Sequence, residues 1–149
     1  MPTPFDDIYD LFLVEIKDYK IDYLQAWPTE ISNYLQGFLM KAIPDFDNCV
    51  QNLEDYNLTN TQFNANLTLT EKSILSNLMV IKWLNKEIND VTQFNLHLND
   101  TDFKHYSEAQ NLQQKTSHRD GLREIINQDM TRYGLKNTPW SDWANGNFT

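Results

Sequence analysis

The chain has 149 residues, of which 40% are hydrophobic and 13% aromatic, and its formal net charge at pH 7 is −9. This length and composition indicate a single domain with a substantial core and exclude a disordered chain. The single cysteine, Cys49, excludes an internal disulfide, and no apolar run is long enough to cross a membrane.

Hydrophobic periodicity predicts an all-α fold, a bundle of four to five helices that ends in one long helix. The first helix is expected to use Thr3 as its N-cap, with Pro4 at the first helical position. It should end near Tyr23 or Trp27, before Pro28. Residues 1–16 carry four acids and do not form a basic, apolar leader. The protein is therefore expected to be intracellular when made, and not secreted.

A second helix is expected to begin at Thr29 and to keep a three-four apolar spacing as far as Ile43. Pro44 should break or kink it, because proline removes an amide donor and clashes with the preceding turn. The apolar spacing then resumes at four positions: Phe46, Cys49, Val50 and Leu53. The pattern therefore predicts a bent or split helix.

Residues 55–67 contain four asparagines and no sustained apolar period, which predicts a connecting loop. Thr68 and Glu71 have the spacing of a capping box, so a helix is expected to begin there. Between Ile74 and Ile88 apolar residues cover most of the helix circumference. This pattern is typical of a helix at the centre of a bundle or in an oligomer interface.

A shorter segment from Val91 to Leu98 and a turn at residues 99–102 precede the last predicted helix. That helix should begin at Phe103 or Ser107 and end at Tyr133, with Gly134 as a left-handed C-cap. The sequence thus divides into a helical domain, residues 1–134, and an extended arm, residues 135–149.

The arm carries three large aromatic side chains among polar residues, proline and glycine: Trp140, Trp143 and Phe148. Such residues are costly to leave in water, so the arm should either fold back on its own domain or anchor to a partner. The two alternatives predict different effects of truncation. Only an arm that covers its own core would stabilise the isolated protein.

No catalytic, cofactor or metal site can be recognised in the sequence. His97, His105 and His118 do not share metal-ligand spacing with cysteine or carboxylate pairs. The four glycines form no phosphate-binding loop. Cys49 lies on an apolar stripe, where a buried structural thiol is the simpler interpretation. The sequence therefore predicts neither an enzyme nor a cofactor.

The charge is distributed unevenly along the chain. Residues 1–60 carry eleven acidic and three basic side chains, whereas residues 104–149 carry five acidic and six basic ones. This gradient disfavours sequence-specific nucleic-acid binding, which needs clustered cations, but suits a head-to-tail contact between copies. The predicted contact residues are Asp6, Asp7, Asp10, Arg119, Arg123 and Arg132. The alternative is that these charges simply form solvated faces.

Several short patterns together resemble a known group of proteins. They are FNANLT at residues 63–68, Glu71, ILSNLMV at 74–80, Trp83-Leu84, Asp102-Phe103-Lys104, Tyr106-Ser107, Ala109 and Leu112, and upstream Ala42-Ile43, Phe46, Cys49 and Leu53. Through these patterns, residues 31–133 resemble small virion proteins of tailed phages that infect low-GC Gram-positive bacteria.

The resemblance implies a helical head-to-tail connector, an adaptor of the phage neck between the portal and the tail. Such adaptors form homo-oligomeric rings of about twelve copies. Trp140, Trp143 and Phe148 would then dock on the portal protein or on a neighbouring neck or tail protein. The protein would reside in the virion, and in the host cytoplasm during assembly. The alternative function is an acidic, soluble, phage-encoded inhibitor or nucleic-acid mimic.

Overall fold

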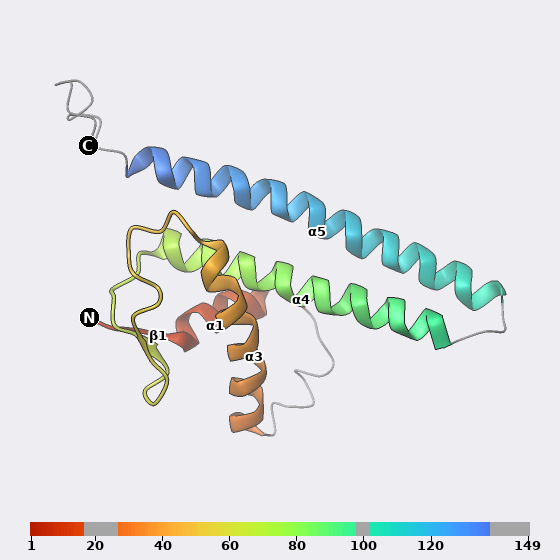
Figure 1. Ribbon diagram of the computed structural model, residues 1–149, viewed down its shortest axis with the longest axis horizontal. Helices are drawn as coiled ribbons and strands as arrows, with labels where there is room; N and C mark the ends of the chain where they lie inside the picture. Colours follow the sequence, from red (N-terminus) through yellow and green to blue (C-terminus); the bar gives the residue numbers. More distant parts are fainter. Residues whose placement is uncertain (17–26, 98–101, 138–149) are drawn as a thin grey trace.

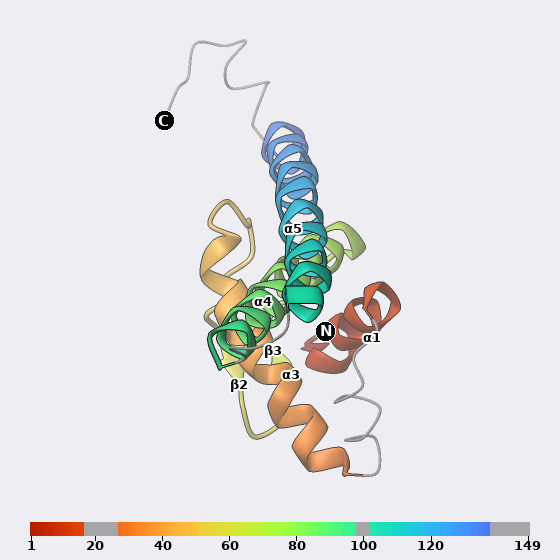
Figure 2. The ribbon, with the colours of Figure 1, turned by 90° about the vertical axis from the view of Figure 1, so that its right-hand side faces the viewer.

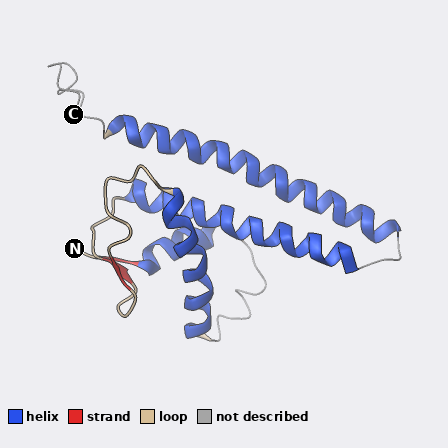
Figure 3. Ribbon diagram, viewed as in Figure 1, coloured by secondary structure: helices blue, strands red, loops and turns tan. Residues whose placement is uncertain are grey.

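The computed structural model of the chain describes residues 1–16, 27–97 and 102–137. Within them the fold is helical, with α1 (Phe5–Glu15), α3 (Pro28–Ala42), a 3-10 helix η1 (Ile43–Asp45), α4 (Leu69–His97) and α5 (Asp102–Lys136) (Figure 1). A small sheet of two-residue strands lies near the N-terminus (Figure 3). The structure confirms the predicted all-α class.

The helices form layers around α4. α1 and α3 pack against one side of α4, while α5 packs against the opposite side (Figure 2). α4 and α5 run antiparallel, and the far half of this hairpin projects beyond α1 and α3 (Figure 1). The molecule therefore has a packed base, which contains the sheet, and a long projecting hairpin.

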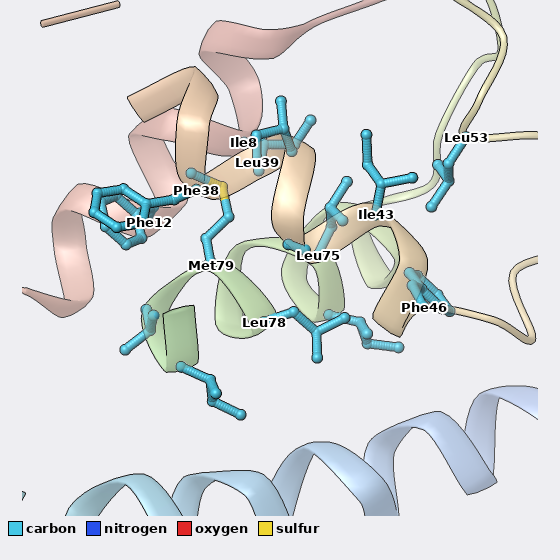
Figure 4. Packing of buried hydrophobic residues seen from close by; sticks show 14 of the residues in the cluster. Ile8, Phe12, Phe38, Leu39, Ile43, Phe46, Leu53, Leu75, Leu78 and Met79 are labelled. Carbon is cyan, nitrogen blue, oxygen red and sulfur yellow. The ribbon is translucent and has the colours of Figure 1, made fainter. Parts of the chain in front are cut away.

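The core lies at the base, where apolar faces of α1, α3 and α4 meet. Figure 4 shows Phe12 of α1 and Phe38 of α3 close to Met79 of α4. Within residues 74–84 of α4, seven apolar side chains are buried: Ile74, Leu75, Leu78, Met79, Val80, Ile81 and Leu84. This confirms the prediction of a central helix, since α4 is covered from both sides.

The predicted start and end of the first helix are wrong. Thr3 lies in strand β1 (Thr3–Pro4), where its hydroxyl donates to the Ala65 carbonyl and accepts from the Leu67 amide, each at 2.9 Å. Its hydroxyl is thus committed to a neighbouring segment and cannot cap α1. The helix ends at Glu15 because Ile16 is extended, with φ −124° and ψ 156°. The expected ends at residues 23 and 27 both lie beyond this break. Residue 23 is outside the described ranges.

Pro44 ends the second helix as predicted, since α3 gives way there to η1. The predicted helix over residues 46–53 is wrong, because this segment consists of turns and irregular backbone. Phe46 and Leu53 are nevertheless buried, whereas Val50 is 64% exposed. The apolar spacing therefore marked residues that reach the core from a non-helical segment.

The expected loop at residues 55–67 contains two short strands, β2 (Tyr56–Asn57) and β3 (Gln62–Phe63). The sheet order is β1-β3-β2, all antiparallel, with Thr3 and Tyr56 on either side of Phe63. Phe63 is fully buried, and the centroid of its ring lies 4.9 Å from the ring centroid of Phe5. The sheet thus fixes the N-terminus of the chain to the loop before α4.

The two long helices differ from the prediction at their ends. α4 continues to His97, through the segment that was expected to be separate. α5 continues to Lys136, so Gly134 is not a C-cap: the Asn137 amide still donates to the Tyr133 carbonyl at 3.1 Å. A Cβ atom at Gly134 would lie 3.1 Å from Asn48 Nδ2. The absence of a side chain at Gly134 thus allows the loop that carries Asn48 to approach α5.

None of the described helices combines the length and apolar character that a membrane crossing requires. Trp140, Trp143 and Phe148 lie outside the described residues, and the predicted roles of these three aromatics stay predictions.

Candidate functional site

A buried carboxylate lies at the start of α4. Glu71 is only 2% exposed, and its Oε1 accepts a 2.8 Å hydrogen bond from the Thr68 amide. The Glu71 amide donates in return to Thr68 Oγ1 at 3.2 Å. The capping box predicted from these two residues is confirmed. It satisfies backbone donors at the N-terminal end of α4 and holds the Glu71 carboxylate in the protein interior.

The other carboxylate oxygen binds a residue from the far end of the chain. The Tyr133 hydroxyl of α5 donates to Glu71 Oε2 at 2.7 Å and accepts from the Val50 amide at 2.9 Å. The Cys49 thiol donates to the same Oε2 at 3.5 Å. We call Glu71, Tyr133, Cys49 and Val50 the Glu71 cluster. It joins α4, α5 and the loop after η1 at a single point.

The environment keeps these groups in their ordinary protonation states. Burial alone would raise the pKa of Glu71, but hydrogen bonds from Thr68 and Tyr133 outweigh it and lower this pKa. Burial raises the pKa of Tyr133, and its bond to Glu71 raises it further. Burial likewise raises the pKa of Cys49 to about 11. At neutral pH the cluster therefore holds a carboxylate, a phenol and a thiol, which fixes α5 to the base without supplying a reactive nucleophile.

The lowered pKa of Glu71 predicts a pH dependence of stability. Because the folded-state pKa is below the ordinary value of 4.5, the stabilisation is fully present above that pH and is lost as the pH falls through the folded-state value. Glu71→Gln should therefore lower the urea midpoint more at pH 7 than at about pH 3. Equal losses at both pH values would contradict the ionised hydrogen-bonded carboxylate.

A cavity of about 290 Å³ opens beside the cluster, where α5 ends. Its lining comprises Val50, Gln51, Thr68, Thr70, Glu71, Arg132, Tyr133, Lys136 and Asn137. Arg132 and Lys136 are exposed and stand one helical turn apart on α5. The floor is a buried polar cluster and the rim is cationic. Lys136, which the sequence assigned to the extended arm, is the last residue of α5 and lies at this rim.

The predicted contact residues lie on two separate sides of the subunit. Asp6 and Asp10 are exposed on α1, and Arg123 and Arg132 are exposed on α5. α4 separates the two helices, so the acids and the arginines do not meet within one subunit (Figure 2).

Two of the predicted contact residues have partners inside the subunit. Asp7 forms a 3.1 Å ion pair with Lys72 of α4. Arg119 donates to Asn85 at 3.0 Å and also contacts Asp120. These two residues help to hold α1 and α5 on α4, which leaves Asp6, Asp10, Arg123 and Arg132 as the exposed members of the set.

Sequence reasoning missed Tyr133, Val50 and Lys136 as parts of a site. Tyr133 was placed only as the last residue of a helix, and its partner Glu71 lies 62 positions away. No local signal reports a contact over that separation. Lys136 was missed because the predicted helix ended at Tyr133, whereas α5 continues to Lys136 and places it one turn beyond Arg132.

Within the described residues, no group of three or more histidine, cysteine or carboxylate side chains is placed to hold a metal ion. Comparison of the chain with protein family models, with curated proteins and with solved structures gives no match.

Proposed function

We propose that this protein is a structural virion protein of a tailed phage, an adaptor that forms a ring in the neck between the portal and the tail. The observation that carries the proposal is the separation of charge across the layers of the fold. α1 has four acids and no basic residue, whereas α5, at the opposite side of α4, balances five acids with six lysines and arginines, among them the exposed Arg123, Arg132 and Lys136. Opposite, complementary faces are what a closed heterologous ring requires.

The α4–α5 hairpin supports the same proposal. α5 has 35 residues, which corresponds to a length of about 50 Å and exceeds what the small base needs for its own core. Among its described side chains, only Ile126 and Tyr133 are buried. A polar hairpin that projects from a packed base can span the height of a ring wall.

The Glu71 cluster gives the arm a fixed origin. Tyr133 is hydrogen-bonded to Glu71 at the start of α4 and to Val50 in the loop after η1. These bonds fix the C-terminal end of α5, which residues 138–149 follow in the sequence. In the proposed function, Trp140, Trp143 and Phe148 are the anchors that dock in a groove of the portal or of a neighbouring neck or tail protein. The net charge of −9 would also keep DNA phosphates from adhering to the wall of the conduit.

The test is to follow the protein by immunoblot after infection with the phage that encodes it, through a density gradient that separates full particles from soluble protein. We expect co-sedimentation with DNA-filled particles. Recovery only in the soluble fraction would overturn the virion assignment and favour the acidic inhibitor. Replacement of Trp140, Trp143 and Phe148 by serine keeps the arm length, and should release the protein from particles if these residues are the anchors.

A further inference from the structure

We propose that subunits dock head to tail through one defined pair of surfaces. The outer stripe of α1, formed by Asp6, Asp10 and Val14, binds the cationic rim of the cavity beside the Glu71 cluster in a second copy. The inference rests on the proposed function, since it specifies how the copies of such a ring contact one another. It also makes Lys136 and Val14, which the sequence did not single out, part of the interface.

The stripe lies on the side of α1 that faces away from the core. Asp6, Asp10 and Val14 are spaced by four residues, so they lie above one another on successive turns, and all three are exposed. Val14 is 81% exposed, while Ile8 and Phe12 on the inner side are fully buried. The stripe thus offers two carboxylates and an apolar side chain in a row.

The cationic rim of the cavity has the same four-residue spacing of charges as the stripe on α1. Arg132 and Lys136 are four residues apart on α5, and the described part of the structure gives neither an ion-pair partner. Each patch therefore presents two like charges four residues apart, about 6 Å along the helix axis. Val50, which is 64% exposed, lines the same cavity and offers an apolar contact for Val14. Two ion pairs and one apolar contact can form together.

Glu71 does not oppose this docking, although it lines the cavity. Its carboxylate already accepts hydrogen bonds from the Thr68 amide, the Tyr133 hydroxyl and the Cys49 thiol. Its charge is stabilised by donors within the subunit and is only 2% exposed, whereas Arg132 and Lys136 present exposed charges at the rim.

The fold prevents the two patches from meeting within one subunit. α1 and the C-terminal end of α5 lie on opposite sides of α4, yet both belong to the base and not to the projecting half of the hairpin (Figures 1 and 2). A second copy is therefore needed to pair them, and each docking leaves one free patch of each kind. Such a heterologous contact repeats from copy to copy and leaves the projecting half of each hairpin outside the contact.

The experiment is sedimentation velocity on the full chain with two reversed variants, D6K/D10K and R132E/K136E. Each variant alone places like charges in contact, so we expect its apparent Kd for self-association to rise at least about tenfold. A mixture of the two restores both contacts: the new lysines face the new glutamates, and the unchanged acids face the unchanged cations. The mixture should therefore associate to within about threefold of the original protein.

E30K/E54K is the matched control for D6K/D10K, because it makes the same change in net charge at exposed positions outside both patches. It should associate like the original protein, and all variants should keep its circular dichroism spectrum. Failure of the mixture to associate would overturn the docking, and so would loss of association in only one of the two reversed variants. A monomeric protein that still co-sediments with full particles would overturn the docking while leaving the proposed function intact.

Discussion

Replacement of Leu75 by alanine is expected to lower the free energy of unfolding by about 3 kcal/mol, within the range measured for buried leucines. Leu75 is fully buried on α4, which packs against α1 and α3 at this level (Figure 4). The loss combines the transfer of the missing methyl groups with the cavity that they leave. Its size depends on how far the packed neighbours can move into the space.

Leu69 is the matched control for this prediction, since it is a leucine on the same helix but is 72% exposed. Leu69→Ala should change the free energy of unfolding by less than about 0.5 kcal/mol. Urea unfolding followed by circular dichroism measures both variants. Equal losses at the two positions would show that α4 is not the centre of the core.

The sequence predicted the start and the central position of α4, although not its continuation to His97, because these two signals are local. The capping box needs only Thr68 and Glu71, three residues apart, and the apolar residues that surround the helix from Ile74 onward imply a central position. Both features can be recognised without knowledge of the fold. The all-α class followed from the same periodicity in the other helices.

The prediction failed where long-range contacts decide the backbone. Phe46 and Leu53 kept a helical spacing and are buried as that spacing implied, but their segment is not helical. The Val50 amide, which would serve a helix, donates instead to the hydroxyl of Tyr133, 83 residues away. Thr3 is a similar case, since its hydroxyl serves Ala65 and Leu67 across the sheet.

The candidate site was predictable only in its separate parts. Glu71 was identified as a capping residue and Arg132 as a member of a basic surface, but nothing in the sequence places Tyr133 between α4 and the loop after η1. The charge gradient predicted which ends of the chain are acidic and basic. It could not show that Asp7 and Arg119 are engaged within the subunit, by Lys72 and Asn85.

Tyr133→Phe is expected to lower the free energy of unfolding by about 2 kcal/mol, because a hydrogen bond to a charged group contributes roughly that much. The change keeps the ring and its contact with Phe46, at 5.3 Å between ring centroids. It removes the donor to the buried Glu71 carboxylate and the acceptor of the Val50 amide. Urea unfolding at neutral pH measures the loss, and hydrogen exchange should quicken at the C-terminal end of α5.

Tyr56→Phe is the control, since Tyr56 is half-buried against Phe5 and its hydroxyl makes no hydrogen bond among the described residues. It should change stability by less than about 0.5 kcal/mol. The Tyr133 effect should also depend on Glu71: in a Glu71→Gln background the same change should cost less, because the acceptor is no longer charged. Additive losses would show that the two side chains do not act as a unit. The fixed origin of the C-terminal arm would then have to come from the apolar contacts of α5 alone.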